Sequence, residues 1–253
     1  MIPSNKITNK SIHIFKDNPE AIFRIFCFHH AAGSASKYLS WHQKLSKQCE
    51  IAAIQFPGRE TRQNEPFYVS AHDAIAEAAA AIMSFGDQPF AIFGHSLGGS
   101  IGYAVALELE RRSGNTPSFV AVAAARPPHL PAPSNLTSNL DDFALIEKLK
   151  MYSGTPPSIL SNTRAISYFL PRVRADLALS ETFVLPQPVE LICPLISFVA
   201  ADDHLVSAKE TNEWRLCATD FTQVSDFAGG HFFVDSLPDR MFCYLNDALL
   251  RVT

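Results

Sequence analysis

The chain has 253 residues, of which 47% are hydrophobic and 18% charged, and its formal net charge is -4. This length and composition are enough to bury one large core, so we expect a single domain over residues 1–253. The slightly negative charge argues against nucleic acid or an anionic membrane surface as a partner, and the absence of a bilayer-length apolar stretch or of a signal-peptide core indicates a cytoplasmic protein.

Apolar runs of strand length recur along the chain, and most are continuous rather than alternating. They lie at residues 21–28, 51–56, 90–94, 118–125, 195–201 and 220–227. Continuous runs are typical of strands buried on both faces of a parallel sheet. Helical patterns at 36–48, 71–85 and 97–112 alternate with them, which predicts an α/β fold with helices on both faces. Later, Ser207–Glu210 has the spacing of a capping box, and Ser236 is expected to precede a last helix that runs through residue 251.

Residues 126–188 break this alternation. They contain nine of the seventeen prolines, no clear strand, and two helical patches near 140–151 and 161–179. A long excursion between two strands of a sheet is seldom an idle loop. We therefore expect a helical lid insertion over the carboxyl edge of the sheet, with Phe169 and Leu177 on its inner face.

The sequence GHSLG, residues 94–98, follows an apolar strand and precedes a helix. This is the placement of a nucleophile elbow, in which a sharp turn exposes a serine and the flanking glycines leave room for the chains that crowd it. Ser96 would be the nucleophile, and the backbone N–H of Leu97 would face the developing oxyanion. The alternative is a glycine-rich turn, suited to a phosphate, in which Ser96 only caps the helix.

A serine nucleophile needs a histidine and a carboxylate, which in this kind of fold come later in the chain and in the order acid, then histidine. Asp202 and Asp203 leave the strand near 195–201, and His231 follows the last strand behind two glycines. From position alone, either aspartate could orient the imidazole.

The second oxyanion donor is expected on a loop of small residues after the first strand, and Ala31 is the candidate. His29 and His30 in that loop are expected to have packing or loop roles. We expect no metal and no organic cofactor, because no histidines, cysteines or carboxylates have the spacing of metal ligands. The five cysteines lie far apart and are expected to be reduced thiols in the core.

Several segments together resemble the type II thioesterases of nonribosomal peptide and polyketide synthesis, which are related to the fatty acid synthase medium-chain thioesterases. The segments are CFHHAAGSAS, QFPGRETRQNEPF, PFAIFGHSLGG, ARPPHLP, LPRVRADLALSETF, ADDHLVS and GGHFFV. Many hydrolases share GHSLG, whereas PGRE followed by R and EP is far more restrictive. The resemblance runs the length of the chain and implies an α/β-hydrolase fold.

The resemblance also implies roles for individual residues. It places a catalytic triad on Ser96, Asp203 and His231, and so favours Asp203 over Asp202 as the acid. The chain departs from the family pattern at four loop positions, and none of these departures removes a group that the mechanism uses. They are His29 for a proline, Ala32 for a glycine, Ala200 for a glycine and His204 for a proline.

The implied activity is hydrolysis of acyl or aminoacyl thioesters on the phosphopantetheine arm of a carrier protein, for editing or for release. Three other functions stay open: a generic acyl-CoA hydrolase or carboxylesterase, a relative that binds carrier proteins without catalysis, and a transferase in which an acceptor other than water enters. We expect a monomer, since no heptad or long apolar stripe suggests an oligomer. Arg59 and Glu60 in PGRE are expected to form a solvated or structural ion pair.

Overall fold

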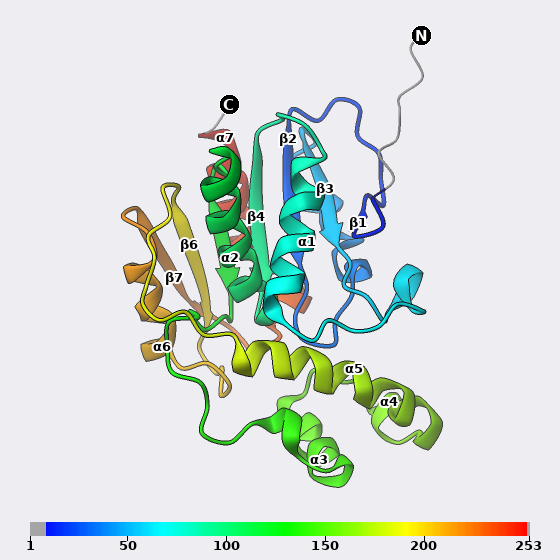
Figure 1. The fold of residues 1–253 in the computed structure, drawn as a ribbon. Helices are drawn as coiled ribbons and strands as arrows, with labels where there is room; N and C mark the ends of the chain where they lie inside the picture. The colour runs from blue at the N-terminus through cyan, green and yellow to red at the C-terminus, as the bar shows by residue number, and fades with distance from the viewer. Residues whose placement is uncertain (1–8, 252–253) are drawn as a thin grey trace.

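A seven-stranded sheet forms the centre of the computed structural model, which describes residues 9–251 (Figure 1). The first eight residues, on which the expectation of no leader segment partly rests, lie outside the described residues. The strand order is β1-β3-β2-β4-β5-β6-β7, and every neighbouring pair is parallel except β1 with β3. The strands are β1 Ile12–His13, β2 Phe23–Phe28, β3 Cys49–Ile54, β4 Phe90–His95, β5 Val120–Ala123, β6 Leu195–Ala200 and β7 Phe221–Phe227.

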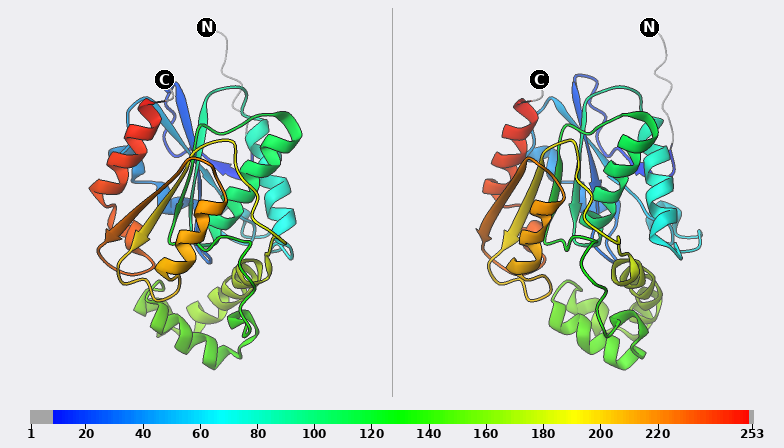
Figure 2. Two further views of the ribbon diagram at one scale, coloured as in Figure 1. Left: turned by 90° about the vertical axis from the view of Figure 1, so that its left-hand side faces the viewer. Right: turned by 60° about the vertical axis from the view of Figure 1, so that its left-hand side comes forward.

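Helices cover both faces of this sheet, as the apolar runs predict (Figure 2). On one face, α1 and α2 pack on β2, β3, β4 and β5 in one hydrophobic cluster. On the other face, α7 and two short 3₁₀ helices, η1 and η2, pack in a second cluster. The predicted mostly parallel sheet between two helical layers is confirmed. These helices are α1 Ala71–Met83, α2 Leu97–Ser113, α7 Asp239–Leu250, η1 Ala35–Tyr38 and η2 Trp41–Gln43.

The prediction of a helix at 36–48 is wrong, because two short 3₁₀ helices, η1 and η2, form there instead. Tyr38 and Trp41 are both buried and three residues apart, a spacing that 3₁₀ turns place on one side. The Trp41 ring packs 4.7 Å from Phe93 and 4.9 Å from Phe242, between centroids. Packing of these aromatic side chains on the sheet therefore sets the backbone here.

The end of the chain agrees with the sequence in one place and differs in another. Ser207 and Glu210 form a capping box at α6 (Ala208–Asn212), as predicted. Ser236 instead ends the 3₁₀ helix η6 (Phe233–Ser236), and the last helix begins only at Asp239, after Pro238. Proline fits immediately before a helix, where no backbone donor is needed. The remaining 3₁₀ helices are η3 Glu60–Arg62, η4 Thr137–Asn139 and η5 Glu213–Leu216.

Between β5 and β6, η4 and three α-helices lie beyond the carboxyl ends of the strands (Figures 1 and 2). The α-helices are α3 Asp142–Tyr152, α4 Pro157–Leu160 and α5 Thr163–Thr182. We call residues 126–188 the helical insertion. Its helices share a small core of their own, formed by Leu145, Leu149, Ile166, Leu170 and Val173. Within residues 9–251, no helix combines the length and apolar character that crossing a bilayer requires.

Candidate active site

Ser96 lies at the turn between β4 and α2, with φ 55° and ψ -120°. Few residues other than glycine adopt a positive φ, so this backbone is strained. The turn is held by a 2.9 Å hydrogen bond from the Ser96 N–H to the carbonyl of Ala123. The side chain of Ser96 does not cap α2, which removes the reading of Ser96 as a mere helix cap.

The glycines around Ser96 are required by close packing. A Cβ on Gly94 would lie 2.1 Å from the carbonyl oxygen of Gly98, and one on Gly98 would lie 2.2 Å from that of Phe28. Backbone atoms cannot move aside as a side chain can. The two glycines therefore let α2 start directly against β4 and the end of β2, which is what a short strand-to-helix turn demands.

Ser96, His231 and Asp203 form one chain of hydrogen bonds. His231 Nε2 lies 2.8 Å from Ser96 Oγ, and His231 Nδ1 lies 2.9 Å from Asp203 Oδ2. Because a carboxylate only accepts, Nδ1 carries the ring proton and Nε2 is free to accept the serine proton. The structure thus brings together the three side chains that the resemblance named.

Asp203 is fixed by two further bonds. Its Oδ1 accepts from the backbone N–H groups of Leu205 at 2.8 Å and Val206 at 3.0 Å. Burial acts to raise the pKa of Asp203, but the hydrogen bonds from His231 and the backbone outweigh it and lower that pKa below its ordinary value. Asp202 is exposed instead. Of the two aspartates, only Asp203 contacts the imidazole among the described residues.

The two proposed oxyanion donors, Leu97 and Ala31, both lie near the serine. Leu97 is the buried first residue of α2, directly after Ser96. Ala31 follows β2 and lines the same cavity as Ser96 and His231. Its neighbour Ala32 has φ 62°, where the resemblance has glycine, so this loop is also strained.

Three further histidines are buried around the site. His95 Nε2 donates to the carbonyl of His231 at 2.7 Å, which ties the elbow to the histidine loop. His30 Nδ1 donates to the carbonyl of Ala31 at 2.8 Å. Burial lowers the pKa of His30 to about 4 and those of His29 and His95 well below the usual value. The His29 ring packs on Phe56 with 4.6 Å between the centroids, so the packing or loop roles expected for His29 and His30 fit the structure. His95 was assigned no role from the sequence.

A cavity of about 530 Å³ opens at Ser96 between the sheet edge and the helical insertion. Phe169, Val173 and Leu177 of α5 form part of its wall, at a spacing that places them on one side of the helix. Phe169 and Leu177 are thus located where the sequence suggested. Such a volume is typical of small-molecule sites.

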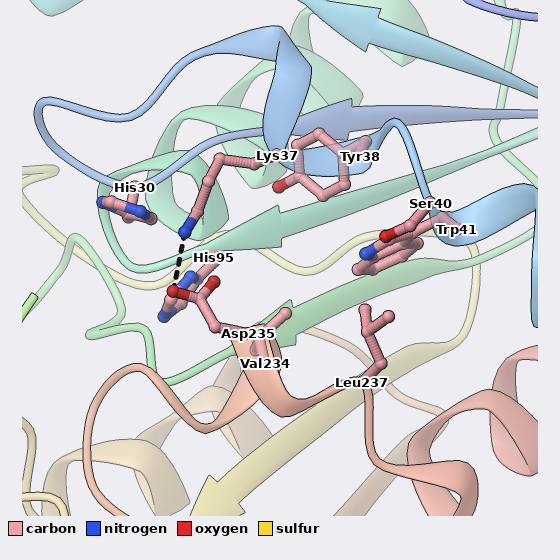
Figure 3. Close-up of a pocket in the computed structure, with 9 residues that line it drawn as sticks. All are labelled: His30, Lys37, Tyr38, Ser40, Trp41, His95, Val234, Asp235 and Leu237. Carbon is pink, nitrogen blue, oxygen red and sulfur yellow. Dashed lines mark hydrogen bonds and ion pairs between the residues drawn. The ribbon is translucent and has the colours of Figure 1, made fainter.

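A smaller side cavity of about 110 Å³ adjoins the first (Figure 3). His30 and His95 lie at one end and Trp41 and Leu237 at the other. Lys37 and Asp235 form a 2.6 Å ion pair that lines both cavities, together with His30. Nothing in the sequence indicated this pair, because 198 residues separate its members.

Arg59 of the PGRE segment pairs with Asp176 of α5 and not with Glu60, so the expected Arg59–Glu60 ion pair is wrong. The Glu60 carboxylate instead accepts hydrogen bonds from the Ser36 hydroxyl at 2.5 Å and from the Gln55 side-chain amide at 3.2 Å. The contact with Asp176 spans 117 residues, which explains why the local sequence did not reveal it.

No group of three or more histidine, cysteine, aspartate or glutamate side chains within residues 9–251 could hold a metal ion. The cysteines are free, and four of them are buried, whereas Cys243 is exposed on α7 rather than in the core. Burial raises the pKa values of Cys49 and Cys193 to about 12, so these thiols are unreactive at neutral pH.

Comparison with known proteins matches a family model described as "Thioesterase domain" to residues 23–242. "Thioesterase PikA5" of Streptomyces venezuelae is 30% identical, over 98% of this chain and 88% of that protein. The type II thioesterase BorB from the borrelidin biosynthetic cluster superposes with a TM-score of 0.84 at 27% identity, covering 97% of this chain and 100% of that chain. ClbQ from the colibactin NRPS/PKS pathway superposes with a TM-score of 0.84 at 26% identity, covering 90% and 97%. The residues matched by the family model, 23–242, include the elbow, both candidate acids, His231 and the whole helical insertion.

Proposed function

Because this chain belongs to the thioesterase family, it hydrolyses thioesters, and we propose that Ser96, His231 and Asp203 carry out the reaction. The observation that carries this proposal is the hydrogen-bonded chain from Asp203 through His231 to Ser96 Oγ, which ends in the 530 Å³ cavity. The family predicted from the sequence resemblance is confirmed by the match over residues 23–242.

In the first half of the reaction, Ser96 Oγ attacks the thioester carbonyl carbon while His231 Nε2 takes the hydroxyl proton. The negative charge that develops on the carbonyl oxygen is met by the N–H groups of Leu97 and Ala31. The carbon–sulfur bond then breaks, and His231 returns its proton to the leaving sulfur. The acyl group remains on Ser96 as an ester.

In the second half, a water molecule gives a proton to His231 Nε2 and attacks the acyl carbon. The oxyanion that forms is stabilised by the same two backbone N–H groups. Collapse of the tetrahedral intermediate returns the proton to Ser96 Oγ and frees a carboxylic acid. Asp203 holds the imidazole in the tautomer that both halves require and stabilises its charged form.

The substrates are acyl or aminoacyl groups on the phosphopantetheine arm of carrier proteins in peptide or polyketide synthesis, where the reaction clears or releases them. BorB and ClbQ, from biosynthetic pathways of this kind, support this assignment. Phe169 and Leu177 would then contact the acyl chain. The helical insertion acts as a lid that shields the acyl ester while admitting a long pantetheine arm. We propose that the enzyme works as a monomer.

The experiment that tests this proposal compares one acyl group on a carrier protein, on coenzyme A and on p-nitrophenol. Ser96→Ala and His231→Ala should each lower turnover by roughly 10⁴ to 10⁶, because the triad acts as a unit. Near-wild-type turnover of a folded Ser96→Ala protein would refute the serine mechanism. Equal preference for carrier protein and coenzyme A would favour a generic acyl-CoA hydrolase instead.

A further inference from the structure

Arg59 and Asp176 form an ion pair in which both side chains are buried, with exposed fractions of 1% and 2%. It is bidentate: Arg59 Nη1 lies 2.6 Å from Asp176 Oδ2, and Nη2 lies 2.8 Å from Oδ1. The flat guanidinium matches the carboxylate in this geometry, so both side chains are fixed in direction as well as in position.

Both members of the pair also bind the loop that follows β2. Asp176 Oδ2 accepts a second hydrogen bond, at 2.6 Å, from the backbone N–H of Ala32. Arg59 Nη1 donates at 3.0 Å to the carbonyl of Gly33. The loop is therefore held through a donor and an acceptor on the two residues directly after Ala31.

This loop needs such support because its backbone is strained. Ala32 has φ 62°, a conformation that an alanine adopts only when its surroundings impose it. The carboxylate of Asp176, bonded to the Ala32 N–H, is a contact that favours this conformation. If the contact were lost, Ala32 could relax, and the N–H of Ala31 would turn with it.

We propose that Arg59 and Asp176 are positioning residues for the oxyanion hole: they hold the Ala31–Gly33 loop from outside so that the Ala31 N–H meets the developing oxyanion. Neither side chain needs to contact the substrate. The inference rests on the proposed function, because it assumes that Ala31 serves the reaction at Ser96.

The pair also connects the oxyanion loop to the wall of the acyl cavity. Asp176 belongs to α5, the helix that carries Phe169 and Leu177 into the cavity. A displacement of α5 would separate Asp176 from Ala32 and leave the buried Arg59 without its partner. The position of α5 and the geometry of the oxyanion hole are thus coupled.

Two variants test this role. Asp176→Asn keeps the size of the side chain but replaces one accepting oxygen by a donor that opposes Arg59. The double variant Arg59→Met, Asp176→Leu replaces the pair by apolar side chains, a change that folded proteins often tolerate, and it leaves the Ala32 N–H and the Gly33 carbonyl without these partners.

Glu50→Gln is the matched control for Asp176→Asn. Glu50 forms an ion pair with Arg24 at 2.6 Å, with exposures of 10% and 13%, at the start of β3 and β2. This is the opposite edge of the sheet from the insertion. The control therefore breaks a similar arginine–carboxylate pair without touching the oxyanion loop.

The measurement is thiol release from an acyl-CoA, together with binding of two inhibitors. A trifluoromethyl ketone analogue adds to Ser96 and forms an oxyanion, whereas the product acid does not. We expect kcat to fall by about 10-fold to 100-fold in both Asp176 variants while KM changes less than about threefold, because the loss is confined to the transition state. Affinity for the ketone should fall by a similar factor, and affinity for the acid should not. The Glu50→Gln control should keep the wild-type kcat.

Several outcomes would overturn the inference. A folded Asp176→Asn or double variant with wild-type kcat and ketone affinity would show that the loop does not need the pair. A rise in KM alone would assign α5 to substrate binding. An equal loss of kcat in the Glu50→Gln control would reduce the effect to general stability. If turnover did not depend on Ser96 at all, the proposed function would fail instead. Comparing the turnover of the wild type with that of Ser96→Ala detects this failure separately.

Discussion

Lowering the pH from 7.5 to 5 is expected to reduce the free energy of unfolding by more than about 2 kcal/mol. The reason is that His29, His30 and His95 are buried as neutral rings, and burial lowers the pKa of each one. Nearby cations add to this effect, since Arg59 acts on His29 and Lys37 on His30. The native state therefore resists protonation in a pH range in which the unfolded chain accepts it.

The sign and size follow from proton linkage. In the unfolded chain a histidine has a pKa of about 6.5, so at pH 5 it is almost fully protonated, whereas His30 with a pKa of about 4 remains mostly neutral in the fold. Because the unfolded state binds more protons in this window, stability falls as the pH falls. With these pKa values His30 contributes about 2 kcal/mol of this loss between pH 7.5 and 5, and His29 and His95 add losses of the same sign.

Urea unfolding at pH 7.5, 6.5, 5.5 and 5 measures the effect. His29→Phe keeps an aromatic ring against Phe56, whose centroid lies 4.6 Å away, and removes one titrating group. The pH-dependent loss should then be smaller than in the wild type. His72→Gln is the control, because His72 is exposed on α1.

Two results would refute this reasoning. One is a loss of less than about 2 kcal/mol between pH 7.5 and 5, since that is the share of His30 alone. The other is an unchanged pH dependence in a folded His29→Phe protein.

Three other changes have defined outcomes. Asp203→Asn should lower turnover far more than Asp202→Asn in steady-state kinetics, because only the former disturbs the imidazole tautomer. The reverse order would move the acid to Asp202. Gly98→Ala should destabilise the fold by several kcal/mol in urea unfolding, because the new Cβ would lie 2.2 Å from the backbone carbonyl that ends β2; wild-type stability would show that the elbow has room. Phe169→Trp and Leu177→Trp should change the ratio of the long-chain to the acetyl thioester hydrolysis rate more than they change the acetyl rate itself, since both residues line the cavity. An unchanged ratio in both variants would mean that α5 does not contact the acyl chain.

Some features of this protein could be predicted from the sequence because their causes are local. A continuous apolar run predicts a strand buried on both faces, and this correctly indicated β2 through β6. Glycines on both sides of Ser96 indicated the elbow, because only glycine fits where backbones approach within contact distance. The capping box at Ser207 and Glu210 depends on residues three apart, so it too could be read directly.

Other features depended on contacts between distant segments. The choice of Asp203 over Asp202 as the partner of His231 rests on two backbone N–H groups that hold the Asp203 carboxylate and on the approach of a loop 28 residues away. The two 3₁₀ helices in place of an α-helix at 36–48 follow from the packing of Trp41 on Phe93 and Phe242, which no local periodicity encodes.

The partner of Arg59 is the strongest case. From the sequence, Glu60 was the nearest opposite charge, yet the guanidinium binds Asp176, which is 117 residues further along the chain. A buried arginine needs a carboxylate that is desolvated with it and has the matching geometry, and proximity in sequence provides neither. The sequence determined that an arginine follows β3 and that an aspartate lies on the helical insertion. Only the packing of α5 over the carboxyl edge of the sheet brought them together, and with them the loop beside Ser96.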